Sequence, residues 1–373
     1  MKTARALTAI MMLAFILLVG CSRETSSNNT LKIGAILPLT GTGAEDGEFQ
    51  KHGIDLAVSK LNAAGGIKGK KVEVVFEDSK NQAKEGIIAL NTLIDRDKVP
   101  VVLSTMSGVS APLAAYAGNK IPAVLFVTVA STPNITKHGS NIFRAFVTSD
   151  VESRVIAEFM YKNGYKNMAV FYVNDDYGLG GKEEFRKRFT ELGGTVAIEE
   201  PYEKGGTDHR SVVAKVTASD VQGAFVIGYD KSFALLVQQL GQTSRKIQLV
   251  TTSTLSVPSW KTLAGASAEG AYLANSLFKA NPDDPMTKEF DAAYQASFGK
   301  PSNYLSASSY TTMMMLASAI ETEGYSKEAI EKGLAHIVKM PTLMGDISVS
   351  DQREASFPVT MARLENGKVV NVK

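Results

Sequence analysis

Cysteine is almost absent from this sequence of 373 residues, which contains only Cys21. A disulfide within the chain needs two cysteines, so we expect none in the fold. Histidine is also scarce, and the four histidines are scattered without the spacing of a metal site: His52, His138, His209 and His336. The sequence therefore predicts neither a disulfide framework nor a bound metal.

Neither sign of charge predominates. The chain has 40 lysines and arginines against 38 aspartates and glutamates, which gives a formal net charge of +2. A protein that binds nucleic acid usually carries a basic patch, and no lysine- or arginine-rich stretch with interleaved aromatics is present here. The composition thus argues against a nucleic-acid partner.

Catalytic and nucleotide-binding motifs are missing as well. The chain has no His-Glu-x-x-His motif, and Gly265–Ala268 is followed by Glu269, where a nucleophile elbow needs glycine. A glycine-rich loop contains Gly41 and Gly43, but Asp46 stands where the dinucleotide fingerprint has its third glycine. The loop also lacks the Lys-Ser/Thr ending of a P-loop. We predict no catalytic residues and no cofactor, which makes an exported hydrolase the least favoured class of function.

The N-terminus has the pattern of an export signal. A basic start, MKTAR, precedes an apolar run over 9–19 that is too short for a comfortable membrane span. Residues 1–21 are predicted to be a lipoprotein signal peptide whose Cys21 becomes lipidated; the alternative is a plain signal peptide with an incidental cysteine. Residues 22–30 are polar and form a flexible tether. The product would be lipid-anchored to a bacterial membrane, facing the periplasm or the cell exterior.

From Leu31 onward, short apolar runs alternate with amphipathic stretches of helical period. In the first block we expect strands at 31–37, 72–77, 101–103 and 123–127, and helices at 48–64 and 81–95. This order is typical of a parallel sheet with helices on both faces.

A second block over 148–251 repeats the order of strand, loop, helix, Gly-Gly, strand and helix. We predict an α/β fold of two doubly wound, Rossmann-like lobes of roughly 120 residues each. The rest of the chain has too few strands for a third lobe, so it must complete the first two. It includes a methionine cluster, Met313–Met315, that we expect in the core, and a closing hairpin around Glu365–Gly367.

Two successive strands, both within 101–136, end in small hydroxyl-bearing turns. One strand runs into Ser104–Gly108 and the next into Thr128–Pro133, each just before a predicted helix. Such turns leave backbone N–H groups facing the crevice where open α/β sheets bind ligands, and helix starts favour anions. These residues could instead serve only as helix caps. The repetition on neighbouring strands favours a ligand site.

These features resemble the Leu/Ile/Val-binding type of periplasmic binding protein, the extracytoplasmic receptor of ABC importers. The resemblance runs from Leu31 to the C-terminus and depends on the order and spacing of several short motifs: Ile33–Gly43, Asn62–Gly69, Met106–Ser110, Ala130–Pro133, Phe143–Arg144, Asp175–Gly178, Gly228–Tyr229, Leu263–Gly265 and Ala268–Gly270. It implies two lobes joined by a three-strand hinge.

The family pattern implies where the lobes divide. The first lobe would comprise 31–147 and 276–345, and the second 148–275 and 346–373. Arg144 would be a hinge residue rather than a ligand contact.

On the first lobe, the resemblance assigns the ligand carboxylate to Ser107 and its neighbouring N–H groups. Ala130 would contribute its carbonyl, and Ser131 its hydroxyl and N–H. Because the alignment is loose by one residue, Thr132 could take the place of Ser131.

On the second lobe, Tyr177 would stack on the ligand and Tyr229 would line the same wall, although either could simply pack within the lobe. Amino-acid binders of this family pair an acidic residue with the α-ammonium, and that position falls on Ser253 here. Asp46 or Asp230 could supply the charge instead. Otherwise the ligand would be a carboxylic acid without an amino group.

The resemblance implies a solute-binding receptor, not an enzyme, which takes an amino acid or related small carboxylate by hinge closure and delivers it to an ABC permease. We expect a monomer. The alternative is a lipoprotein of the same fold that senses its ligand for signalling rather than uptake.

Overall fold

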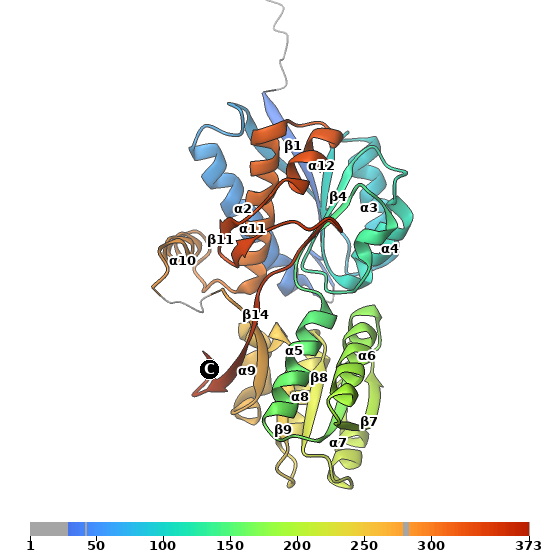
Figure 1. Cartoon of the computed structure of the whole chain (residues 1–373). Helices are drawn as coiled ribbons and strands as arrows, with labels where there is room; N and C mark the ends of the chain where they lie inside the picture. Colours follow the sequence, from blue (N-terminus) through green and yellow to red (C-terminus); the bar gives the residue numbers. More distant parts are fainter. Residues whose placement is uncertain (1–28, 42, 279–282, 373) are drawn as a thin grey trace, which may run out of the picture.

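The computed structural model describes residues 29–41, 43–278 and 283–372. It has two α/β lobes, one above the other in Figure 1, each built on its own sheet. The predicted fold class is confirmed. The predicted signal peptide and Cys21 lie outside the described residues. Within the described part of the chain, no helix is both long and apolar enough to cross a membrane.

The first lobe contains a six-stranded sheet in the order β13-β5-β4-β3-β1-β2, with every neighbouring pair parallel. Its strands are β1 Thr30–Leu37, β2 Lys71–Asp78, β3 Val101–Ser104, β4 Val124–Thr128, β5 Ile142–Ala145 and β13 Glu354–Ala355. The strand order reverses between β1 and β3, which is where such sheets form a ligand crevice.

Helices cover both faces of this sheet. They are α2 Ala44–Ala63, α3 Ala83–Asp95, α4 Ser107–Ala117, the short helix η1 Ile135–His138, α10 Pro285–Phe298, α11 Tyr304–Glu323 and α12 Lys327–Ala335, and a hairpin of β11 Met340–Thr342 and β12 Gly345–Ile347 follows. The helix predicted to begin at 48 begins at Ala44, because Gly43 adopts a left-handed φ of 99° and starts it early. Asp46 therefore lies in a helix rather than in a loop.

The second lobe contains a seven-stranded sheet in the order β15-β14-β10-β9-β8-β6-β7. Its strands are β6 Asn167–Val173, β7 Thr195–Tyr202, β8 Gly223–Ile227, β9 Gln248–Thr251, β10 Tyr272–Ser276, β14 Val359–Glu365 and β15 Lys368–Asn371. The first five are parallel, whereas β14 and β15 add an antiparallel edge through the predicted hairpin.

The helices of the second lobe are α5 Ser149–Lys162, α6 Asp176–Glu191, α7 Arg210–Thr217, α8 Asp230–Gly241 and α9 Pro258–Ala264, with short helices η2 Ser253–Ser256 and η3 Gly265–Ala268. Each of the turns after β6, β8 and β9 leads into a helix at the carboxyl end of its strand. These turns therefore form the second lobe's side of the crevice.

The chain crosses between the lobes after β5, after β10 and after β13. The last crossing corrects one predicted boundary. We expected the second lobe to resume at 346, but β13 pairs with β5 in the first sheet, at Glu354 with Arg144 and Ala355 with Ala145. The return to the second lobe therefore lies between Ala355 and Val359.

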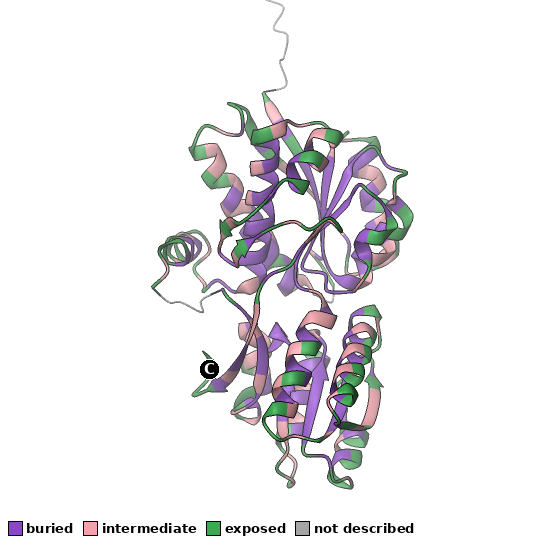
Figure 2. Ribbon diagram, in the orientation of Figure 1, coloured by how far each residue is buried: buried purple, intermediate pink, exposed green. Residues whose placement is uncertain are grey.

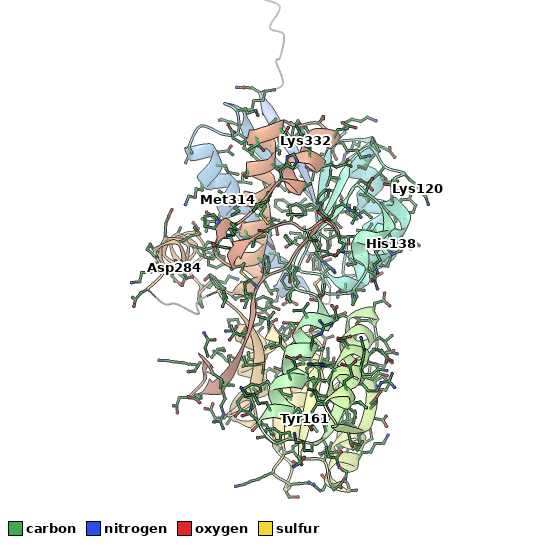
Figure 3. The ribbon with its side chains drawn as sticks, viewed as in Figure 1. Lys120, His138, Tyr161, Asp284, Met314 and Lys332 are labelled. Atoms are coloured by element: carbon green, nitrogen blue, oxygen red, sulfur yellow. The ribbon has the colours of Figure 1, made fainter. Side chains whose placement is uncertain are left out.

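The central strands of each sheet are buried between its helices (purple in Figure 2), whereas the edge strands β2, β7 and β15 are partly exposed. The methionine cluster belongs to the core of the first lobe, as predicted. Met313 and Met315 are fully buried, and Met314 is half-buried on α11 (Figure 3).

Arg144 fastens the hinge side of the first lobe. Its side chain is 2% exposed and donates to Glu354 of β13 through Nε at 2.6 Å and Nη2 at 2.8 Å. The remaining nitrogen, Nη1, donates to the carbonyls of Ala130 and Thr132. One buried guanidinium thus joins the last strand of the sheet to the turn after β4.

We predict that Arg144→Gln lowers the free energy of unfolding by about 2–4 kcal/mol, because it leaves the Glu354 carboxylate and two carbonyls without a charged donor. Chemical denaturation monitored by circular dichroism would measure this. Arg96→Gln, which removes an exposed arginine paired with Asp97, is the control and should shift the midpoint little. Equal midpoints for the two variants would contradict the role given to Arg144.

Candidate ligand-binding site between the lobes

A cavity lies at the carboxyl ends of both sheets and takes residues from both lobes; together with the solvent space at its mouth it comprises about 510 Å³. Its lining includes Asp46, Met106, Ser107, Val129, Ser131, Phe146, Glu152, Tyr177, Tyr229, Ser253, Thr254, Val257, Trp260, Tyr304 and Leu305. Six of the nine predicted ligand-binding residues are in this lining: Asp46, Ser107, Ser131, Tyr177, Tyr229 and Ser253.

Ser107 is the first residue of α4 and organises the turn opposite it. Its Oγ accepts the backbone N–H groups of Ser131 at 3.0 Å and Thr132 at 3.1 Å. A serine hydroxyl that accepts two hydrogen bonds still has its own proton to donate. The start of α4 therefore offers an O–H donor, and the positive end of the helix dipole favours an anion there.

Two predicted contacts on the first lobe lie behind the cavity wall. Ala130 and Thr132 are buried but are not among the lining residues, and their carbonyls accept hydrogen bonds from Arg144. Ser131, between them, lines the cavity. The structure thus favours Ser131 over Thr132 at the position that the loose alignment left open.

Asp46 lies in the first turn of α2 and is 5% exposed. Its Oδ1 has no hydrogen-bond partner among the residues that the structure describes. Burial raises the pKa of this carboxyl to about 7, and the neighbouring Glu45 adds to the rise. The indole of Trp260 lies near enough to oppose the rise in pKa in part. The prediction that Asp46 faces the ligand, rather than solvent, agrees with this position.

The second lobe supplies a wall of two tyrosines, whose rings are 6.0 Å apart and tilted by 44°. The Tyr177 hydroxyl donates to Thr252 Oγ1 at 2.9 Å, and the Tyr229 hydroxyl donates to Asp175. Burial raises the pKa of both phenols, so both stay neutral donors. Asp175 also caps α6 by accepting the N–H groups of Tyr177 and Gly178 at 3.1 Å each, which fixes the position of this wall.

Glu152 is a lining residue that the sequence analysis did not predict. It lies in the first turn of α5, directly after the first crossing, and is 2% exposed. The Ser253 hydroxyl donates to its Oε1 at 2.8 Å. Burial raises the pKa of the Glu152 carboxyl to about 7, although the hydrogen bond from Ser253 opposes the rise. The family pattern places an acid at position 253, where this chain has serine. Glu152, on α5, instead brings a carboxyl into hydrogen-bond contact with Ser253.

Asp230 lies outside the lining of the cavity. We predicted it as a second partner for a ligand ammonium, but it is not among the lining residues. Its Oδ1 accepts the N–H of Ser232 at 2.7 Å and the Ser232 hydroxyl, and its Oδ2 accepts the N–H of Gly205 at 3.1 Å. Asp230 itself has a left-handed φ of 70°, so its carboxylate serves the tight turn that begins α8.

Three aromatic residues of the lining were also missed. Phe146 belongs to the first crossing, Trp260 to α9 and Tyr304 to the start of α11. None follows a parallel strand directly, so the strand-end rule could not find them. Their positions depend on how helices pack against the crevice, which no local pattern in the sequence specifies.

The charges of the lining are unbalanced. Asp46 and Glu152 are both carboxylates, and no lysine or arginine lines the cavity within the described residues. Lys204 lies near the start of α4, since its ammonium would be 3.5 Å from a Cβ built on Gly108. This ammonium is paired with the Asp175 carboxylate at 3.0 Å. The cavity therefore favours a ligand with at least one cationic group.

We predict that Glu152→Gln stabilises the protein without ligand, and more so at high pH. The carboxyl of Glu152 has a pKa near 4.5 in the unfolded chain and about 7 in the folded protein. Between these values the native state binds more protons than the unfolded state, so the free energy of unfolding falls as pH rises. The gain from the variant should be about 2 kcal/mol larger at pH 8 than at pH 5, measured by denaturant unfolding. Glu158→Gln, on the half-exposed side of the same helix, should show little such dependence. A gain independent of pH would contradict a desolvated carboxyl at 152.

Comparison with known proteins adds to this geometry. A profile of the family described as periplasmic binding protein matches residues 30–368. Leu/Ile/Val-binding protein homolog 3 of Brucella melitensis is 27% identical over 349 residues, which cover 92% of this chain and 94% of that relative. The leucine-, isoleucine-, valine-, threonine- and alanine-binding protein of Pseudomonas aeruginosa is 26% identical over 311 residues, covering 82% of each.

A solved structure agrees with the arrangement of the lobes. The branched-chain amino acid transporter substrate-binding protein LivJ from Streptococcus pneumoniae, in complex with isoleucine, aligns with a TM-score of 0.85 and 25% identity, over 92% of this chain and 99% of that one. These relatives are binding proteins rather than enzymes by name. The predicted resemblance is confirmed: the chain belongs to the family of periplasmic binding proteins, of the two-lobed type I.

Proposed function

We propose that this protein is the extracytoplasmic receptor of an ABC importer and binds an α-amino acid between its lobes. The observation that carries the proposal is the pairing of two opposite chemistries across one cavity. The hydroxyl of Ser107 at the start of α4 suits a carboxylate, and the buried carboxyl of Glu152 on the other lobe suits an ammonium. An α-amino acid carries both groups on one carbon.

The carboxylate would bind to the first lobe. Ser107 would donate its hydroxyl, which its two accepted N–H bonds leave free, and Ser131 lines the cavity beside it. The dipole of α4 adds a favourable interaction of about 0.3–1 kcal/mol with an anion at this end. A carboxylate held in this way needs no basic side chain.

The ammonium would bind to the second lobe, on Glu152. A charge-assisted hydrogen bond between the ammonium and the carboxylate would offset the unfavourable burial of this carboxylate and so favour binding. Ser253 would keep the carboxylate oriented through the hydrogen bond at 2.8 Å. The aromatic wall of Tyr177 and Tyr229 would then cover the ligand.

Import would follow from hinge closure. The ligand would dock first on one lobe and draw the other toward it, and the closed form would be recognised by a membrane permease. The name of the LivJ relative associates it with transport, which favours uptake over the sensory alternative. Lipidation of Cys21 would keep a monomeric receptor at the membrane surface, and mass spectrometry of the exported protein would test this anchor.

A thermal-shift and calorimetric screen tests the ligand class. The panel is the common L-amino acids, benzoate and short aliphatic acids, followed by the α-hydroxy analogue of the best amino acid. We expect an amino acid to raise the melting temperature, and its α-hydroxy analogue to bind at least tenfold more weakly because Glu152 then has no cation to pair. Tighter binding of an acid without an amino group would refute the proposal.

We further predict that Ser107→Ala weakens binding of that amino acid more than tenfold while the fold survives. The matched control is Ser110→Ala, one turn further along α4, where a buried hydroxyl is bonded to Ser104 at 3.0 Å and does not line the cavity. Isothermal titration calorimetry of both variants would measure the difference. Unchanged affinity in Ser107→Ala would remove this residue from the site.

A further inference from the structure

One carboxylate of the cavity is in excess over what a simple amino acid needs. An α-amino acid with an apolar side chain has a single ammonium, which Glu152 satisfies in the proposed function. Asp46 then remains on the other lobe, 5% exposed and with Oδ1 unpartnered among the described residues. A buried polar group that stays unpaired costs about 1–3 kcal/mol, and more when it is charged.

The surroundings of Asp46 are polar too. Gln50 follows one turn later on α2, is 0% exposed, and has no partner within the described chain for either polar atom of its side chain. Positions four residues apart lie on the same face of a helix. Asn303, which caps α11 just before Tyr304 of the lining, likewise has its Nδ2 unpartnered there.

These groups belong to one region of the first lobe. A Cβ at Gly53 would lie 2.1 Å from the Ser306 carbonyl oxygen, so the backbones of α2 and α11 are in direct contact next to Gln50 and Asn303. The side of the cavity that Asp46 lines therefore backs onto unsatisfied polar groups. A branched apolar side chain placed against Asp46 would leave its carboxyl unpaired.

We infer that the ligand carries a second nitrogen, an amino or guanidino group at the end of its side chain, which binds Asp46. This inference rests on the proposed function and narrows it from α-amino acids to those with a basic side chain. The α-ammonium pairs with Glu152 and the distal cation with Asp46, so that each buried carboxylate meets one positive charge. Trp260 and Tyr304 line the cavity with Asp46, and aromatic rings are suitable neighbours for an alkyl stem and a cation.

Matched pairs of amino acids test the inference. L-Lysine and L-norleucine have the same chain length and differ in the distal ammonium, and L-ornithine and L-norvaline form a shorter pair. Calorimetry on the purified protein at pH 8 should show the nitrogen-bearing member of at least one pair binding tenfold or more tightly. If the apolar member binds as tightly in both pairs, the inference is overturned while the proposed function stands. If no α-amino acid binds at all, both fail together.

Variants locate the effect. Asp46→Asn keeps the shape of the side chain and should reduce the affinity for the basic ligand more than tenfold, while changing that for its apolar match less than threefold. Glu45→Gln removes a charge from the same turn of α2, outside the lining, and should change both affinities less than threefold. An equal loss for both ligands in Asp46→Asn would show a structural role instead and would count against the inference.

Discussion

Two carboxyl groups, Asp46 and Glu152, are held almost out of water on opposite lobes, and neither has a cationic partner in the described part of the chain. Folding such groups is unfavourable, because a buried charge without a partner loses its hydration and gains nothing in return. The surrounding structure must therefore supply the stability that they remove. A ligand that brings a positive charge can pair with such a carboxyl, and this pairing then contributes to the free energy of binding.

Much of that stability comes from the scaffold behind the cavity. Arg144 anchors the turn after β4 through two carbonyls and ties it to β13 through Glu354. The carbonyls of this turn accept hydrogen bonds from Arg144, whereas the N–H groups of Ser131 and Thr132 donate to the Ser107 hydroxyl on the cavity side. The guanidinium of Arg144 thus supports the site from outside the cavity, and the carboxyls of Asp46 and Glu152 inside it stay available to a ligand.

The fold and half of the site could be predicted because they follow from local rules. Strand ends in parallel sheets point to a crevice, which indicated the turn that contains Ser107, and the family resemblance added Tyr177 and Tyr229. Asp230, which we considered as a partner for a ligand ammonium, instead accepts hydrogen bonds within its own turn and from Gly205. The strand-end rule could not reach Glu152, because that residue follows a crossing between the lobes, and its nearness to Ser253 depends on tertiary packing. The last domain boundary was misplaced for a related reason: the two-residue strand β13 exists only through its pairing with β5.

One side chain of the crossings between the lobes is also part of the cavity lining. Phe146 belongs to the first crossing and lines the cavity, and it packs edge-to-face on Phe357 of the third crossing, with ring centroids 5.9 Å apart. On its other side it lies 6.4 Å from the ring of Tyr304, another lining residue. Aromatic contacts of this kind have a preferred geometry, so rotation of one crossing changes the contact with the other. If the lobes close on a ligand, as we propose, Phe146 is in contact with both the ligand cavity and the third crossing.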